Sequence, residues 1–214
     1  MTARTKLGIF CMVLGVLLLA GAVGLIVYNN RQTAQAGASS AEVLHELRTE
    51  MTDPTEDTGI YPEEPTEPDA PLPPVELLTA EDLIMTEKTI RGWNYIGYLS
   101  VPSLELELPI LSQWSYRGLQ FAPARYWGSI KGRNLVLVAH NYPTHFGKIN
   151  TLTESDTVTF TDMDGKVWVY QVVGKDVVEP SAVEEVTSGV YDLTLLTCTY
   201  GGQSRVCVYF DLVE

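Results

Sequence analysis

The sequence is poor in positive charge and in metal-ligating side chains, and each shortage excludes a class of protein. Only 14 lysines and arginines stand against 27 acidic residues, which gives a formal net charge of -13. Nucleic-acid-binding domains carry a basic patch, so that function is excluded. Three histidines and three cysteines in 214 residues form no ligand cluster of the usual zinc type. We therefore expect neither a metal nor a cofactor.

The acidic charge is concentrated in one segment. Residues 37–87 hold 14 acidic residues and one basic residue, whereas residues 88–214 hold 13 acidic and 10 basic residues. Residues 52–76 also contain seven of the twelve prolines. Such a composition cannot bury enough apolar surface to fold, and like charges extend it. We expect an acidic, proline-rich, disordered stalk over residues 29–87, in which residues 41–51 form either a short amphipathic helix or a fraying turn.

An uncharged apolar run of 22 residues occupies positions 7–28. A helix of that length covers about 33 Å, enough for a hydrocarbon core of about 30 Å. Two basic residues within the tail 1–6 precede the run and Arg31 alone follows closely, so the rest of the chain is expected outside the cell. We expect a single-pass anchor in the cell membrane. The alternative is a signal peptide cleaved near residues 34–36, although its apolar core usually has only about 7–15 residues.

From about residue 88 the sequence has the pattern of a β-protein. The stretch LELELPI alternates as a half-buried strand does, and NLVLVAH (134–140) suits a strand buried on both faces. Asp162–Gly165 is a hairpin turn signal, which explains its aspartates better than a calcium site does. Helix is indicated only at 114–120 and 181–187. The expected strands are Tyr95–Val101, Leu104–Ile110, Asn134–His140, Thr157–Thr161, Val167–Val173, Leu193–Cys198 and Arg205–Leu212. Seven or eight short strands imply a closed or nearly closed β-barrel over residues 88–214.

Cys198 is the centre of the one constellation that carries chemistry. A cysteine nucleophile needs a base or a cation nearby to become a thiolate. His140 ends an apolar strand, and His145, in the loop that follows, is the alternative base. Arg205 opens the strand after Cys198, across a turn that contains Gly201 and Gly202. In a hairpin closed by residues 199 and 204, Cys198 and Arg205 lie opposite each other and share one face.

Cys207 is the alternative partner for Cys198, since disulfides are common in exported domains. In the same hairpin register Cys207 lies opposite Leu196 and is only a diagonal neighbour of Cys198. Their Cα atoms are then about 7–8 Å apart, beyond the usual limit of about 6.8 Å for a disulfide. We expect Cys207 to pack as a small apolar group.

These residues resemble the sortases, the cysteine transpeptidases of Gram-positive bacteria. TLLTC (194–198) is similar to the family's T-L-x-T-C signature, and Arg205 and His140 stand where the family places its arginine and its histidine. YLSVPSLELELPI (98–110) resembles its early strands, and the likeness covers about residues 90–213. The resemblance implies an all-β, closed, eight-stranded sortase-like barrel with short helices.

The resemblance also implies a reaction. Cys198 would be the nucleophile, His140 the acid and base, and Arg205 the group that steadies the substrate carbonyl and oxyanion. Thr197 would add a hydroxyl or backbone donor to the oxyanion hole. The substrates would be surface proteins or pilins with a C-terminal LPxTG-like sorting signal, cleaved between Thr and Gly. The acceptor would be an amine of a peptidoglycan precursor or of a pilin.

Two other functions are compatible with the same residues. One is a cysteine peptidase or hydrolase that releases its substrate to water. The other is a non-enzymatic, stalked binding module in which Cys198 is merely buried. No candidate catalytic group lies within residues 1–87, so we expect that segment to be dispensable for the chemistry.

Overall fold

The computed structural model of the chain describes residues 3–52, 79–80 and 83–213. These residues belong to two compact units, residues 1–35 and 36–214. Positions 53–78 and 81–82 of the expected stalk, which include its seven prolines, lie outside the described residues.

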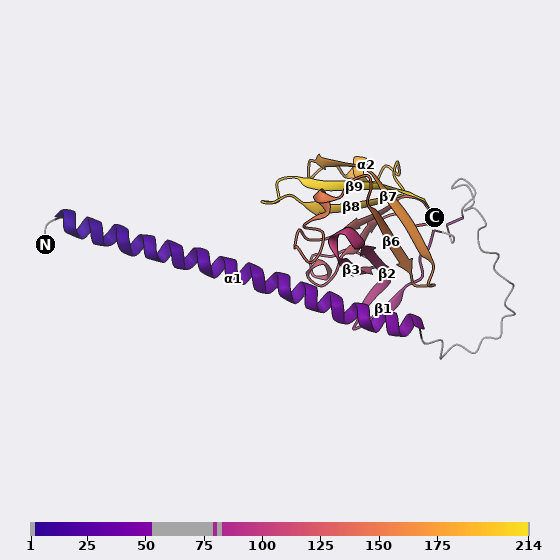
Figure 1. Ribbon diagram of the computed structural model, residues 1–214, viewed down its shortest axis with the longest axis horizontal. Coiled ribbons are helices and arrows are strands. Elements are labelled where there is room, and N and C mark those ends of the chain that lie inside the picture. Colours follow the sequence, from indigo (N-terminus) through magenta and orange to yellow (C-terminus); the bar gives the residue numbers. More distant parts are fainter. Residues whose placement is uncertain (1–2, 53–78, 81–82, 214) are drawn as a thin grey trace. The chain divides into compact units, whose positions relative to one another are not determined.

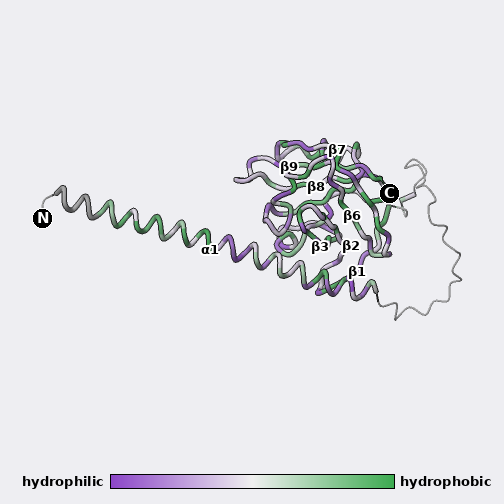
Figure 2. Tube along the Cα trace, viewed as in Figure 1, coloured by the Kyte–Doolittle hydropathy of each residue, from purple (hydrophilic) through white to green (hydrophobic). Residues whose placement is uncertain are grey.

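The first unit consists of the beginning of helix α1 (Ala3–Thr52). Its large apolar side chains from Phe10 to Tyr28 are exposed, and Leu17, for example, is 63% exposed. Figure 2 shows that the helix changes from hydrophobic to more hydrophilic residues along its length. A helix that is apolar all round is buried in a protein core or in a membrane. By length and composition, α1 is therefore a candidate membrane span.

The second unit begins with the last part of α1, from Ala36 onward. Val43, Leu44 and Leu47 are buried, and Leu47 is completely inaccessible. Val43 and Leu47 belong to one apolar cluster with Ile90 and other barrel residues. Positions 43, 44 and 47 share one helical face, which explains why this stretch docks. Residues 29–52, expected within the stalk, are thus helical, and those from residue 36 belong to the barrel unit.

Eight strands close the barrel, which Figure 1 shows as a ribbon. The sheet order is β1-β2-β3-β4-β5-β8-β9-β7-β6, and β6 also pairs with β2. The closed ring therefore contains the eight strands β2 to β9. β1 is not part of the ring and pairs with the first residues of β2. The strands are β1 (Lys88–Ile90), β2 (Trp93–Val101), β3 (Leu106–Leu111), β4 (Ala124–Trp127), β5 (Leu135–Val138), β6 (Thr157–Asp162), β7 (Val167–Val178), β8 (Leu193–Cys198) and β9 (Arg205–Leu212). The expected closed eight-stranded barrel is confirmed.

Four short helical turns lie between the strands: η2 (Pro102–Leu104), η3 (Gly118–Gln120), η4 (Ile149–Thr151) and α2 (Val183–Val186). Two of them, η3 and α2, fall within the stretches where helix was expected. The bounds of β8 and β9 are those expected from the sequence, whereas β5 ends at Val138, two residues before His140. β1 and β4 were not predicted, because three or four residues give too little periodicity.

The barrel interior is filled by one large apolar cluster that includes Leu99, Leu137, Phe160 and Phe210. On β5, Leu135 and Leu137 face this cluster while Val136 belongs to another, so the strand is buried on both faces as expected. Ring closure between β2 and β6 depends on Gly97. A Cβ at Gly97 would lie 2.1 Å from the Thr161 carbonyl oxygen, and its φ of +142° disfavours other residues.

We expect Leu47→Ala to lower the free energy of unfolding of the barrel by about 2–5 kcal/mol, because it leaves a cavity in the cluster that joins α1 to the barrel. His45→Ala, on the exposed face of the same helical turn, is the matched control and should change little. Unfolding of the full chain in detergent micelles can be followed by tryptophan fluorescence. Equal stability of the two variants would show that residues 36–51 do not dock on the barrel in solution.

Candidate active site

Cys198 is the last residue of β8, and its position follows from the β8–β9 hairpin. The strand before it, Leu193–Thr197, is buried, whereas Cys198 itself is half-buried. Cys198 pairs with Arg205, the first residue of β9, and Leu196 pairs with Cys207. This is the register expected from the sequence, and both Cys198 and Cys207 are free thiols. The hairpin therefore places a partly accessible thiol directly opposite a permanent cation.

The turn between the two strands is closed by hydrogen bonds at its base. Thr199 N–H donates to the Ser204 carbonyl (3.0 Å), and Gly202 N–H donates to the Thr199 carbonyl (2.9 Å). Gly201 and Gly202 both have positive φ, +92° and +76°, which only glycine adopts without strain. The glycine pair thus makes the tight return that brings β9 back beside Cys198.

Arg205 is held by the same turn. Its Nη1 donates to the carbonyl oxygens of Gly202 and Ser204, each at 3.1 Å. These two bonds fix the guanidinium beside the end of β8. A guanidinium carries five N–H groups, so donors are left for a substrate carbonyl.

Thr197 joins the cysteine strand to the histidine segment. β5 and β8 are parallel, with Val138 opposite Leu196. Beyond that pair, Ala139 N–H donates to the Leu196 carbonyl (3.1 Å), and Thr197 Oγ1 donates to the Ala139 carbonyl (2.9 Å). The register, continued by two residues, brings His140 beside Cys198. The hydroxyl proton of Thr197 is therefore committed to the backbone and is not offered to an oxyanion.

His140 is half-buried next to this junction. Burial alone lowers its pKa below the usual value of 6.5. A lowered pKa keeps the imidazole neutral at neutral pH, because burial penalises the charged form. A neutral imidazole can accept the thiol proton, which is the property that a general base needs.

Two cavities meet at Cys198. The first, of about 230 Å³, is lined by His140, Cys198 and Arg205 together with apolar and aromatic side chains. Trp114, Tyr116 and Tyr126 form an aromatic group there, with ring centroids 5.5 and 5.8 Å from Trp114. Further lining comes from the end of β7 and the segment that follows it: Val178, Glu179, Pro180, Ala182, Val183 and Val186. All three expected catalytic side chains thus face one apolar cavity.

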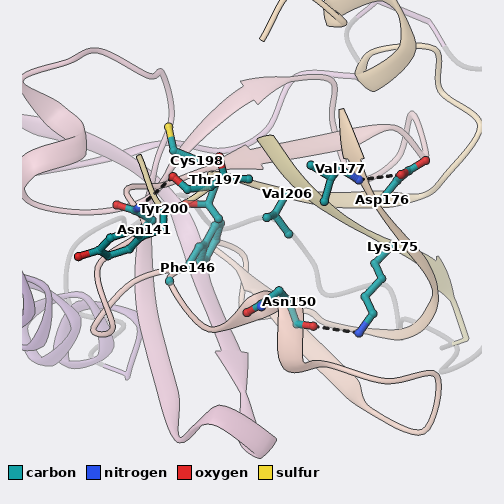
Figure 3. Close-up of a pocket in the computed structure, with 12 residues that line it drawn as sticks. Asn141, Phe146, Asn150, Lys175, Asp176, Val177, Thr197, Cys198, Tyr200 and Val206 are labelled. Carbon is teal, nitrogen blue, oxygen red and sulfur yellow. Dashed lines mark hydrogen bonds between the residues drawn. The ribbon is translucent and has the colours of Figure 1, made fainter. Parts of the chain in front are cut away.

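The second cavity is larger, about 590 Å³, and more polar (Figure 3). Cys198, Thr197 and Val206 border it at the barrel end, and its other lining residues include Asn141, Asn150, Lys175 and Asp176. Lys175 Nζ donates to the carbonyls of Asn150 (2.9 Å) and Leu152 (3.0 Å). In Figure 3 the Cys198 sulfur lies at the edge of this group and points away from Lys175.

His145, the alternative base, lies elsewhere. It is completely buried and does not border either cavity at Cys198. Its Nε2 lies 3.3 Å from Ser40 Oγ on helix α1. Burial and the neighbouring His140 lower its pKa to about 4, with the backbone of Ala36 opposing that shift. The structure therefore brings His140, and not His145, to the thiol.

Sequence reasoning missed the aromatic wall of the first cavity. Trp114 and Tyr126 come from segments twelve residues apart with no shared periodicity, so only the fold brings them together. Among the described residues, no three His, Cys, Asp or Glu side chains come together as a metal site requires. Asp162 Oδ1 instead accepts the N–H groups of Asp164 (3.1 Å) and Lys166 (2.9 Å), as expected of a turn.

Residues 99–213, more than half of the chain, match the family model described as the sortase domain. No match was found among the curated proteins. Among solved structures, sortase A from Corynebacterium diphtheriae is 22% identical with a TM-score of 0.51, a likeness that concerns the fold. Sortase C from Streptococcus pneumoniae is 28% identical with a TM-score of 0.50. Sortase C1 from Streptococcus agalactiae is 25% identical, also with a TM-score of 0.50.

These matches cover 57%, 56% and 56% of this chain. They cover 62%, 66% and 68% of the three solved chains, in the same order. The chain therefore spans less than two thirds of the first of these structures.

We expect alkylation of the native protein to distinguish Cys198 from Cys207. Cys207 is completely buried, and burial raises its pKa to about 11, so it has almost no thiolate at neutral pH. Cys198 is half-buried and borders two cavities. Iodoacetamide treatment followed by peptide mass spectrometry should label Cys198 and leave Cys207 unlabelled. The assignment is wrong if Cys207 reacts as fast as Cys198.

We expect the barrel to lose stability between pH 6.5 and about 4 because of His145. In this range the unfolded chain binds a proton at position 145, whereas the folded chain does not. Stability is therefore full above pH 6.5 and falls as the pH drops, by about 3 kcal/mol in total. Denaturant titrations at several pH values should show this slope, and His145→Gln should reduce it. The control His45→Ala should retain it, and a slope unchanged in His145→Gln would refute the assignment.

Proposed function

Because the chain belongs to the sortase family, we propose that it is a membrane-anchored cysteine transpeptidase that cleaves an LPxTG-like sorting signal. The proposal rests on one observation, the position of Cys198, which lines both an apolar and a polar cavity. An enzyme that transfers an acyl group through a covalent intermediate has to admit the acceptor to the nucleophile after the first product has left, and a second cavity beside Cys198 provides such access.

In the first half-reaction the Cys198 sulfur attacks the carbonyl carbon of the substrate threonine. His140 takes the thiol proton and gives it to the leaving amine, so that the C–N bond breaks and a C–S bond forms. The apolar cavity that His140 lines is suited to the leucine and proline of the signal, since its walls include Trp114 and Pro180.

Arg205 supports the charge that develops in this step. Its guanidinium is fixed by two turn carbonyls and lines the same cavity as His140 and Cys198. Donors held in place before the reaction stabilise an oxyanion without a reorganisation cost. Thr197 contributes by tying the cysteine strand to the segment that ends in His140.

In the second half-reaction an amine attacks the thioester. His140 accepts a proton from the amine, a new C–N bond forms, and the C–S bond breaks to release Cys198. The polar cavity suits this acceptor, because Asp176 and two asparagines line it. The acceptor is an amine of a peptidoglycan precursor or of a pilin. The latter is in line with the S. pneumoniae sortase C, whose description concerns pilin substrate specificity.

The apolar helix supports the proposed location. The uncharged run 7–28 follows two basic residues, and α1 is long and apolar enough to span a bilayer. The positive-inside rule then places the barrel on the outer face of the cell membrane. There it meets substrates that are themselves exported and carry a C-terminal sorting signal.

We expect a Leu-Pro-x-Thr-Gly peptide to be cut between Thr and Gly, and an added triglycine to appear joined to the threonine. Cys198→Ala should remove both products, because no acyl-thioester can form, while Cys207→Ala should retain them. Mass spectrometry of the products with and without triglycine measures both results.

Release of only the free acid at saturating triglycine would instead indicate a hydrolase. No cleavage, together with a Cys198 inert to alkylation, would favour a non-enzymatic binding module. Equal loss in Cys207→Ala would contradict the assignment of Cys198 as the nucleophile.

A further inference from the structure

The last part of helix α1, from Ala36 onward, packs closely against the loop that follows His140. At Gly37 an added Cβ would lie 3.0 Å from Thr144 Cγ2. One turn further on, Ser40 is 2% exposed and lies 3.3 Å from His145 Nε2. Both contacts are made to the loop at residues 141–147, which carries the chain away from His140.

The direction of the Ser40–His145 hydrogen bond follows from the third partner. Ser40 Oγ lies 2.7 Å from the Phe121 carbonyl, which can only accept. A hydroxyl has one proton, so Ser40 gives it to Phe121 and accepts the N–H of His145 Nε2. The opposite ring atom, His145 Nδ1, is buried without a hydrogen-bond partner. His145 is thus neutral, protonated at Nε2 and held by helix α1.

A row of three rings leads from His145 back to His140. The rings of His145 and Tyr142 have centroids 5.7 Å apart, and those of Tyr142 and His140 have centroids 5.0 Å apart. Ser40 therefore stands at one end of a continuous set of contacts, and the imidazole beside Cys198 stands at the other.

The loop is too tightly wound to absorb a displacement of His145. Phe146 N–H donates to the His140 carbonyl (3.2 Å), and the N–H groups of His145 and Gly147 both donate to the Tyr142 carbonyl (2.9 Å). A Cβ at Gly147 would lie 2.4 Å from the Asn141 carbonyl oxygen. A shift of the His145 ring is therefore passed on to Tyr142 and His140.

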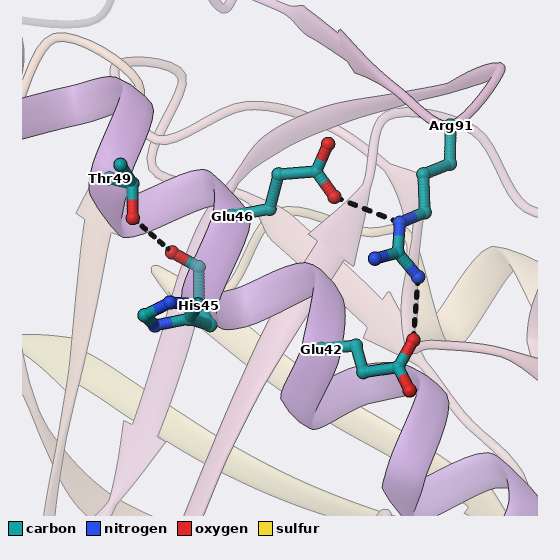
Figure 4. A network of polar contacts seen from close by, with 5 residues as sticks. All are labelled: Glu42, His45, Glu46, Thr49 and Arg91. Atoms are coloured by element: carbon teal, nitrogen blue, oxygen red, sulfur yellow. Dashed lines mark hydrogen bonds and ion pairs between the residues drawn. The ribbon is translucent and has the colours of Figure 1, made fainter.

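Ion pairs connect the helix to residues around β1. Arg91 binds Glu42 (2.6 Å) and Glu46 (2.8 Å), as Figure 4 shows. Lys88 binds Glu50 (2.5 Å) on the next turn. These exposed pairs each contribute little to stability. They do turn the acidic face of α1 toward the basic residues around β1. This orientation determines which face of the helix contacts the loop at residues 141–147.

We propose that Ser40 and His145 are positioning residues for His140, so that the part of α1 from Ala36 onward belongs to the catalytic unit. This replaces the expectation from the sequence that all of residues 1–87 are dispensable for the chemistry. This rests on the proposed function, in which His140 moves the proton. A misplacement of about 1 Å can cost about 10²-fold in rate. Loss of the Ser40 hydroxyl should therefore slow catalysis without changing the cavities that bind substrate.

The experiment compares Ser40→Ala with Ser39→Ala, its neighbour on the same helix, in the full chain in detergent micelles. We expect Ser40→Ala to lower kcat for the Leu-Pro-x-Thr-Gly peptide by about 10-fold, with KM within about 2-fold. Ser39→Ala should match the wild type. His145→Gln keeps an N–H donor for Ser40 but removes the ring that faces Tyr142. It should therefore lower kcat while the melting temperature at pH 7.5 stays near that of the wild type.

The pH profile of Cys198 alkylation is a second measurement that needs no peptide. If His140 is positioned through Ser40, Ser40→Ala should shift this profile and Ser39→Ala should not. A wild type that cleaves no peptide would refute the proposed function. The alkylation profiles would still test whether Ser40 and His145 position His140. Wild-type kcat and wild-type alkylation profiles in both Ser40→Ala and His145→Gln would overturn it, even if the melting temperature fell.

Discussion

The parallel pairing of β5 with β8 is the interaction on which the candidate site depends. It places Val138 opposite Leu196, and the hydrogen bond from Thr197 to the Ala139 carbonyl extends the pairing past the end of β5. A strand end is usually a place where the chain diverges, and this bond delays the divergence until His140. The thiol therefore stands at the end of a buried strand and the imidazole two residues beyond another, each at a partly accessible rim. Rigid strands position side chains more accurately than loops do.

Burial also sets the charge states of the groups near the thiol. Desolvation lowers the pKa of both His140 and His145, so both imidazoles are neutral at neutral pH. The permanent charge near the thiol is provided by Arg205, whose guanidinium is fixed by turn carbonyls. In the proposed reaction these two properties are complementary: a neutral imidazole can accept a proton, and a fixed cation can stabilise an oxyanion.

The sequence predicted the parts of the site that follow from local pairing. The hairpin register of Cys198 and Arg205 follows from two short strands joined by a glycine turn, and the closed barrel follows from the number of short strands. Thr197 was expected to offer either its hydroxyl or a backbone donor to the oxyanion. The hydroxyl donates instead to the carbonyl of Ala139, 58 residues away, and a sequence does not show such a contact. The aromatic wall of Trp114 and Tyr126 was missed for the same reason, since contacts between distant segments have no periodic signal.

The end of α1 shows why composition alone places a domain boundary poorly. Glu42 and Glu46 were counted with the acidic stalk, in a stretch expected to be either a short amphipathic helix or a fraying turn, yet both form ion pairs with Arg91. Charge content is the same whether a carboxylate is solvated or paired. The spacing of Val43 and Leu47 is the sequence feature that distinguishes a docked helix from a solvated stalk, because it defines an apolar face that needs a partner. That face meets the barrel, and the compact unit accordingly begins at residue 36.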